Sequence, residues 1–147
     1  IMSGEIKAWM VGERMKIGLP TIYNYLVNKD GEQLFSNKFN LLSFGMVYGI
    51  LINKKIETSK RTALGPISDI SDRHIIDMFD FCYKILDDGR DKNDIIKEMF
   101  DYADGGVEAL NKIYAENGSF NLPSLIRDAE KTWKDRVNDL QNINLTK

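Results

Sequence analysis

The residues that could carry out catalysis in this 147-residue chain are few. It has one histidine, His74, and one cysteine, Cys82, which are eight positions apart. Along a helix that spacing is about 12 Å, so the two side chains cannot act together as base and nucleophile. A single cysteine also cannot close an intrachain bridge, which excludes secreted disulfide scaffolds. We therefore expect no catalytic residue and a protein that is not an enzyme.

Two acidic clusters are the groups most similar to a metal site. They are Asp87-Asp88-Gly89-Arg90-Asp91 and Asp101-Tyr102-Ala103-Asp104-Gly105-Gly106. Neither has the alternating ligands and the glutamate at loop position twelve that define an EF-hand loop. The glycine pair also lacks the three spaced glycines of a dinucleotide-binding loop. We interpret the acidic side chains as helix caps and a solvated face, and expect no metal and no cofactor.

Four basic residues are the best candidates for binding: Lys54, Lys55, Lys60 and Arg61. They lie on a segment without apolar periodicity, where long cationic side chains can follow a phosphate chain, so we consider them candidates for nucleic-acid binding. The alternative is a solvated loop that balances acidic residues of the same molecule or of a neighbouring subunit. The sequence pI of about 5.5 argues against tight DNA binding by the chain alone.

Charge is distributed unevenly along the chain, although 20 basic and 22 acidic residues give a net charge of only −2. Residues 1–62 hold nine basic and five acidic side chains, whereas residues 63–118 hold six basic and thirteen acidic ones. A domain polarised in this way has one face suited to a polyanion or an acidic partner and another that repels it.

The elements that position these residues are mostly helices. Apolar spacing and capping residues predict helices over residues 20–29, 39–52, 72–88, 92–104, 107–118 and 123–140. Ser71 and Asp91 are the expected N-caps of the third and fourth helices. Gly105 and Gly106 are expected to end the fourth helix in a left-handed cap. The region before Asp30-Gly31 also fits a short N-terminal hairpin, and residues 53–66 are expected to form a loop or a short extended segment.

The helix from Phe39 to Ile52 is apolar in nearly every direction, which predicts a buried central position. Gly45 and Gly49 lie four residues apart on one of its faces, where another helix can approach closely. The uncharged run from Phe39 to Asn53 has 15 residues, fewer than the roughly 20 that span a bilayer. We expect no membrane contact, and in the absence of a visible signal peptide we expect a cytoplasmic protein.

These patterns predict an all-α fold in one domain over residues 1–147. We expect a compact bundle of five or six helices around the glycine-containing helix. Residues 1–34 are expected to form a peripheral N-terminal segment, residues 35–118 the core, and residues 119–147 a C-terminal amphipathic helix.

Three stretches, taken in order, resemble a known family. They are the apolar helix, the turn Lys60-Arg61-Thr62-Ala63-Leu64, and the acidic helix pair that ends with residues 100–110. They are similar to the small accessory proteins encoded beside bacterial DNA phosphorothioation (Dnd) systems, which have an Arg-Thr-Pro-Leu-like turn and a Glu-Tyr-Ala-Asn-Gly-Gly-like element. The resemblance covers about two thirds of the chain. Ala63 stands where that family's pattern has proline, and Asp104 where it has asparagine.

The resemblance implies a non-enzymatic accessory subunit or adaptor of a bacterial anti-phage DNA modification or restriction complex. Its partner would be a larger protein subunit, and DNA would be contacted through that complex. The resemblance also implies structural roles for Tyr102, Gly105 and Gly106, with Tyr102 packing where the next helix begins. The alternative is a stand-alone DNA-binding regulatory module of a defence operon. The sequence does not indicate an oligomeric state.

Overall fold

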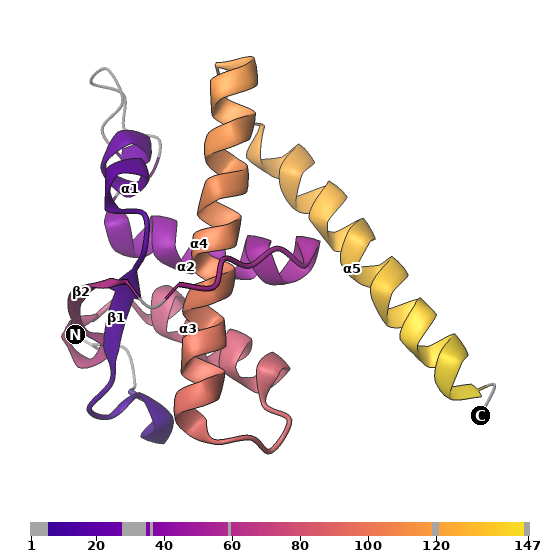
Figure 1. Cartoon of the computed structure of the whole chain (residues 1–147), viewed down its shortest axis with the longest axis horizontal. Coiled ribbons are helices and arrows are strands. Elements are labelled where there is room, and N and C mark those ends of the chain that lie inside the picture. The colour runs from indigo at the N-terminus through magenta and orange to yellow at the C-terminus, as the bar shows by residue number, and fades with distance from the viewer. Residues whose placement is uncertain (1–5, 28–34, 36, 59, 119–120, 146–147) are drawn as a thin grey trace.

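The computed structural model describes residues 6–27, 35, 37–58, 60–118 and 121–145 (Figure 1). The described residues are mostly helical, with one small sheet. The helices are α1 (Pro20–Val27), α2 (Lys38–Ile52), α3 (Arg73–Leu86), α4 (Lys92–Asn117) and α5 (Leu122–Leu145). The strands are β1 (Arg14–Ile17) and β2 (Thr62–Pro66), and the 3-10 turns are Ala8–Met10 and Ile67–Asp69. The helical prediction is therefore confirmed in outline, whereas a purely all-α fold is wrong.

The sheet joins two distant parts of the chain. β1 and β2 pair antiparallel, with Arg14 opposite Pro66 and Ile17 opposite Thr62. Exposed and buried residues alternate along β1, as expected for a strand with one face on the core. The hairpin considered around residues 30–31 lies outside the described residues. Strand β1 instead pairs with part of the segment that was predicted to be a loop or a short extended stretch.

α2 and α4 cross in close contact, which is the helix packing that the spacing of Gly45 and Gly49 predicts. A Cβ atom added at Gly49 would overlap the carbonyl of Tyr102, and one added at Gly106 would overlap the carbonyl of Gly45. Only glycine leaves room for the two backbones to approach this closely. The crossing therefore depends on glycines in both helices.

α4 runs without interruption through Gly105 and Gly106, so the prediction of a helix end at this pair is wrong. Neither glycine has a positive φ, and both are buried. Tyr102 accordingly lies within α4 and not at the start of a new helix. Glycine costs about 1 kcal/mol relative to alanine inside a helix, but here it allows contact with neighbouring backbone. The left-handed cap occurs at Gly118, where φ is 71°.

The chain that leaves α2 turns back across α4, so that α4 is held between α2 and this returning segment (Figure 1). We call residues 54–56 the return segment. A Cβ atom on Gly105 would overlap the carbonyl of Lys54, and the backbone N–H of Ile56 donates to the carbonyl of Asp101 at 2.9 Å. Gly106 therefore faces α2 while its neighbour Gly105 faces the return segment.

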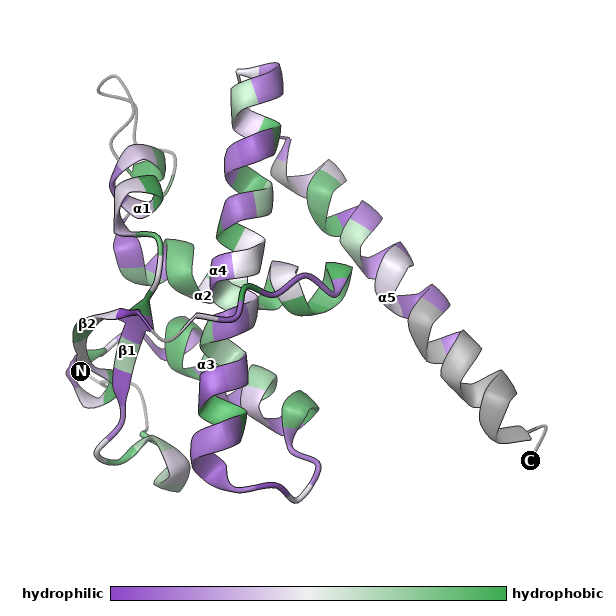
Figure 2. Cartoon of the chain, viewed as in Figure 1, coloured by the Kyte–Doolittle hydropathy of each residue, from purple (hydrophilic) through white to green (hydrophobic). Residues whose placement is uncertain are grey.

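Many of residues 6–27 belong to the core, contrary to the peripheral position that we expected for residues 1–34. Met10, Met15, Tyr23 and Leu26 have no exposed surface. The pairing of β1 with β2 and the packing of α1 against α2 and α4 bring these residues inside. Figure 2 shows apolar residues concentrated along α2, whereas the early turns of α4 carry many hydrophilic ones.

The helix starts follow the capping rules closely. Asp91 caps α4 as predicted, because its side chain accepts a hydrogen bond from the backbone of Asn93. Asp72, and not Ser71, caps α3 by accepting from the backbone of His74 at 2.9 Å. α5 contacts α2 and runs obliquely away from the end of α4 (Figure 1).

The substitution Gly106→Ala tests the close crossing by the sign of its effect. Helix propensity alone predicts a gain of about 1 kcal/mol in the free energy of unfolding. Overlap of the new Cβ with the carbonyl of Gly45 predicts a loss of about 1–3 kcal/mol instead. We expect the loss, measured by urea unfolding, while Ala115→Gly at an exposed position of the same helix calibrates the propensity term. A stabilised Gly106→Ala variant would contradict the crossing.

Candidate functional site

A buried ion cluster fixes the chain that follows the return segment to α4. Arg61 donates from Nε to Asp104 at 2.9 Å, and from Nη2 to Asp101 at 2.6 Å and to the carbonyl of Ile56 at 2.9 Å. The backbone N–H of Gly18 donates to both carboxylate oxygens of Asp104, at 3.1 and 3.2 Å. The side chains of Arg61, Asp101 and Asp104 are only 6%, 4% and 0% exposed. We call these three side chains the Arg61 cluster.

The pKa shifts of this cluster reflect its burial. Burial raises the pKa of Asp104 above its ordinary value, although hydrogen bonds from Gly18 and Arg61 act in the opposite direction. Burial disfavours the charged form of Arg61, but hydrogen bonds to Asp104 and Asp101 raise its pKa overall. The pKa of the buried Tyr23 hydroxyl is raised by burial and by Asp104. The guanidinium thus stays charged and serves as a fixed structural cation.

The four basic residues predicted to bind nucleic acid are not equivalent in the structure. The Arg61 guanidinium is turned inward and paired with acidic side chains, so little of it is accessible to a phosphate chain. Lys54 Nζ lies 3.1 Å from a carboxylate oxygen of Glu108. These two residues therefore balance acidic residues of the same molecule, which is the alternative that the sequence left open.

Lys55 and Lys60 are more accessible. Lys55 Nζ lies 3.6 Å from Glu57 and 5.6 Å from the centre of the Tyr102 ring. The Tyr102 hydroxyl in turn donates to Asn53 at 3.3 Å. Lys60 is exposed and forms no ion pair within the described part of the chain. Of the four residues, these two retain most of their capacity to meet an anion.

The histidine and the cysteine do not form a reactive pair. His74 is exposed in the first turn of α3, whereas Cys82 is fully buried further along the same helix. Burial raises the pKa of the Cys82 thiol to about 12. A thiol with this pKa is almost entirely protonated near neutral pH and is a poor nucleophile.

The acidic clusters separate into two kinds of residue. Asp87, Asp88 and Asp91 are exposed, and Asp91 is a helix cap, as predicted. The interpretation as a solvated face is wrong for Asp101 and Asp104, because both are buried in the Arg61 cluster. Within the described ranges, no group of three histidine, cysteine, aspartate or glutamate side chains could hold a metal ion.

An apolar groove of about 380 Å³ lies among α2, α3 and α5. Its lining residues are Phe44, Val47, Tyr48 and Leu51 of α2, Met78, Phe81 and Ile85 of α3, and Ile126, Glu130 and Trp133 of α5. Phe81 is 54% exposed and Ile126 is 38% exposed, so part of this apolar surface meets solvent. Exposed apolar grooves of this kind commonly bind other proteins.

Comparisons with protein-family models, with curated proteins and with solved structures found no match. The comparisons therefore assign the chain to no family. Among the described residues, none of the helices combines the length and the apolar character needed to cross a bilayer.

The sequence did not reveal the partners of Arg61. Asp101 and Asp104 lie 40 and 43 positions away from it along the chain, and only the folded backbone brings them together. One local signal was available: Lys97, Asp101 and Asp104 are spaced so that a continuous helix places them on one face. Lys97 Nζ does lie 3.1 Å from Asp101. A glycine pair also fits a helix end, so the pattern did not favour one long helix over two.

Replacing Arg61 with methionine should destabilise the fold strongly, because Asp104 would remain buried without a cation and Asp101 would keep only the half-exposed Lys97. We expect a loss of about 3–5 kcal/mol in the free energy of unfolding, measured by urea titration. Arg73→Met removes a 74% exposed arginine that pairs with Asp77 and should change stability by less than about 0.5 kcal/mol. Equal effects of the two substitutions would show that the Arg61 cluster is not a structural link.

The Cys82 thiol should be unreactive in the folded protein. At about pH 8 we expect no reaction with a disulfide reagent in the native state and full reaction in denaturant, because burial holds the thiol protonated. The same pKa shift predicts that the free energy of unfolding falls as pH rises from 9.0 towards about 12, since only the unfolded thiol loses its proton there. Rapid native-state labelling would contradict the buried position.

Proposed function

We propose that this chain is a cytoplasmic, non-enzymatic accessory subunit of a bacterial DNA modification or restriction complex, and that it acts by binding a larger protein subunit. The apolar groove among α2, α3 and α5 is the observation that carries the protein-binding part of this proposal. The resemblance to Dnd-associated accessory proteins supplies the class of partner.

The groove favours an amphipathic helix as the partner's binding segment. Three helices form its walls, and apolar side chains dominate its lining. Among the lining residues that the structure describes, Glu130 is the one charged side chain. A partner helix with an apolar stripe and one lysine or arginine opposite Glu130 would match this surface. Trp133 and Phe81 are aromatic residues of the type that contributes most to such interfaces.

The stretches that carry the resemblance form one physical unit. α2 crosses α4 at the glycines, the return segment crosses α4 at Gly105, and Arg61 pairs with Asp101 and Asp104. The three stretches that carry the resemblance are therefore in mutual contact in the fold. This contact supports a structural role for the motif, in line with an accessory subunit that has no chemistry of its own.

A contribution to DNA binding remains part of the proposal for the more accessible lysines. Lys55 and Lys60 could reach a phosphate backbone when a larger subunit holds DNA beside them. The net charge of −2 and the internal pairing of Arg61 favour this arrangement over a stand-alone DNA-binding module.

The experiment is co-purification of the tagged chain with the proteins encoded beside it. We expect a large DNA modification or restriction subunit to be retained by the wild type. Phe81→Glu should abolish retention, because it places a charge in the groove, while leaving the melting temperature within a few degrees. Val11→Glu alters a residue that is 66% exposed and does not line the groove, so it should retain the partner. Retention by Phe81→Glu, or a partner with no role in DNA metabolism, would contradict the proposal.

A further inference from the structure

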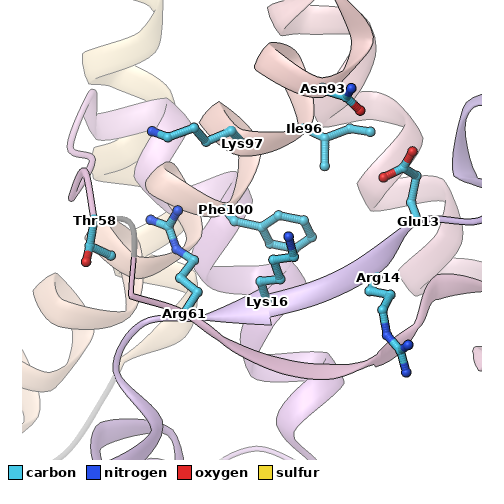
Figure 3. A pocket seen from close by; sticks show the side chains of 9 residues that line it. All are labelled: Glu13, Arg14, Lys16, Thr58, Arg61, Asn93, Ile96, Lys97 and Phe100. Atoms are coloured by element: carbon cyan, nitrogen blue, oxygen red, sulfur yellow. The ribbon is translucent and has the colours of Figure 1, made fainter.

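A second hollow, separate from the apolar groove, lies between the exposed face of β1 and the early turns of α4 (Figure 3). Its volume is about 290 Å³. Phe100 and Ile96 of α4 supply an apolar lining, and both are otherwise buried. Phe100 is only 2% exposed and Ile96 only 7% exposed, so they form a small apolar floor that polar side chains surround.

Basic side chains reach this hollow from three parts of the chain. Lys16 comes from β1, Lys97 from α4, and Arg61 from the chain before β2. Lys16 forms no ion pair among the residues that the structure describes. Lys97 is 54% exposed and shares its charge with Asp101. Arg14 also lines the hollow, although Figure 3 shows its guanidinium pointing away from the centre.

The acidic residue at this site does not cancel its positive character. Glu13 lines the hollow, but one of its carboxylate oxygens lies 3.1 Å from the ammonium group of Lys92. Asp101 and Asp104 are buried and already paired with Arg61. Lys16 is exposed and forms no ion pair among the described residues, so its ammonium group is open to an incoming anion.

We propose that this hollow is a nucleotide-binding site that takes one phosphate and one planar base. The phosphate would meet Lys16 through a charge-assisted hydrogen bond, whereas Lys97 Nζ already donates to Asp101 at 3.1 Å. The base would lie over the small apolar floor of Phe100 and Ile96 and the aliphatic stem of Lys16, and Thr58 and Asn93 line the edge. The volume of about 290 Å³ lies at the lower limit of the roughly 300–1,000 Å³ of small-ligand pockets, so the bound group is no larger than a single nucleotide. The nucleotide would be either free or the terminal residue of a DNA strand.

This site is independent of the proposed protein-binding function. The hollow is formed by β1, α4 and the chain around Thr58 and Arg61, whereas the groove is formed by α2, α3 and α5. Phe81→Glu should therefore leave nucleotide binding unchanged, and Lys16→Glu should leave partner retention unchanged. Failure of one proposal can thus be distinguished from failure of the other.

The test is calorimetric titration of the full chain at low salt with two probes, AMP and a short single-stranded DNA bearing a 5′-phosphate. We expect saturable binding of at least one probe. Lys16→Glu should weaken it about ten- to hundredfold, as expected for the loss of a charge-assisted phosphate contact. The matched control is Lys112→Glu, an exposed lysine on the distal part of α4 that does not line the hollow. It makes the same change in net charge and should keep the affinity within about twofold.

The outcomes separate the two sources of the nucleotide. Binding of AMP that is lost in Lys16→Glu supports a free nucleotide, and binding of the DNA alone with the same loss supports a strand end. Lys16→Met, which keeps the aliphatic stem, provides a second variant and should reduce the slope of log affinity against log salt by about one for a DNA contact. No binding of either probe, or equal weakening by Lys16→Glu and Lys112→Glu, would overturn the proposal.

Discussion

α4 is held on two sides by one continuous stretch of chain, because Gly105 and Gly106 leave no side chain in the way. α2 crosses it at Gly106, and the return segment crosses it at Gly105. Both contacts are between backbones, so even one methyl group would separate them. This constraint explains why α4 tolerates two glycines in its interior, where each lowers intrinsic helix stability by about 1 kcal/mol.

The packing of α2 and the return segment against α4 also determines where the other features lie. It brings Arg61 over Asp101 and Asp104, and these buried charges in turn hold the backbone of Gly18 next to β1. One side of α2 remains beside α3 and α5, where the apolar groove forms. The early turns of α4 remain beside β1, where the cationic hollow forms. The crossing of α2 and α4 thus positions both the proposed protein-binding surface and the proposed nucleotide-binding surface.

The sequence predicted most of the local structure because helix periodicity and caps are local signals. The buried helix with Gly45 and Gly49, and the cap at Asp91, required only neighbouring residues. What could not be predicted depends on distant contacts. Strand β1 has only four residues, and its partner lies far along the chain. The same glycine pair that could end a helix is retained inside one here, because the return segment and α2 pack against it. The inward position of Arg61 likewise follows from carboxylates more than 39 positions away.

The most direct test of this account is residue-level amide hydrogen exchange measured by NMR. If α4 is continuous and packed between α2 and the return segment, the amides of Gly105 and Gly106 should exchange only through global unfolding. Their free energy of exchange should then equal that of the slowest core amides. Tyr102 and Leu110, buried residues of α4 on either side of the pair, should show the same protection. Fast exchange confined to Gly105 and Gly106 would show a break between two helices and would contradict the crossing on which the groove, the hollow and the Arg61 cluster depend.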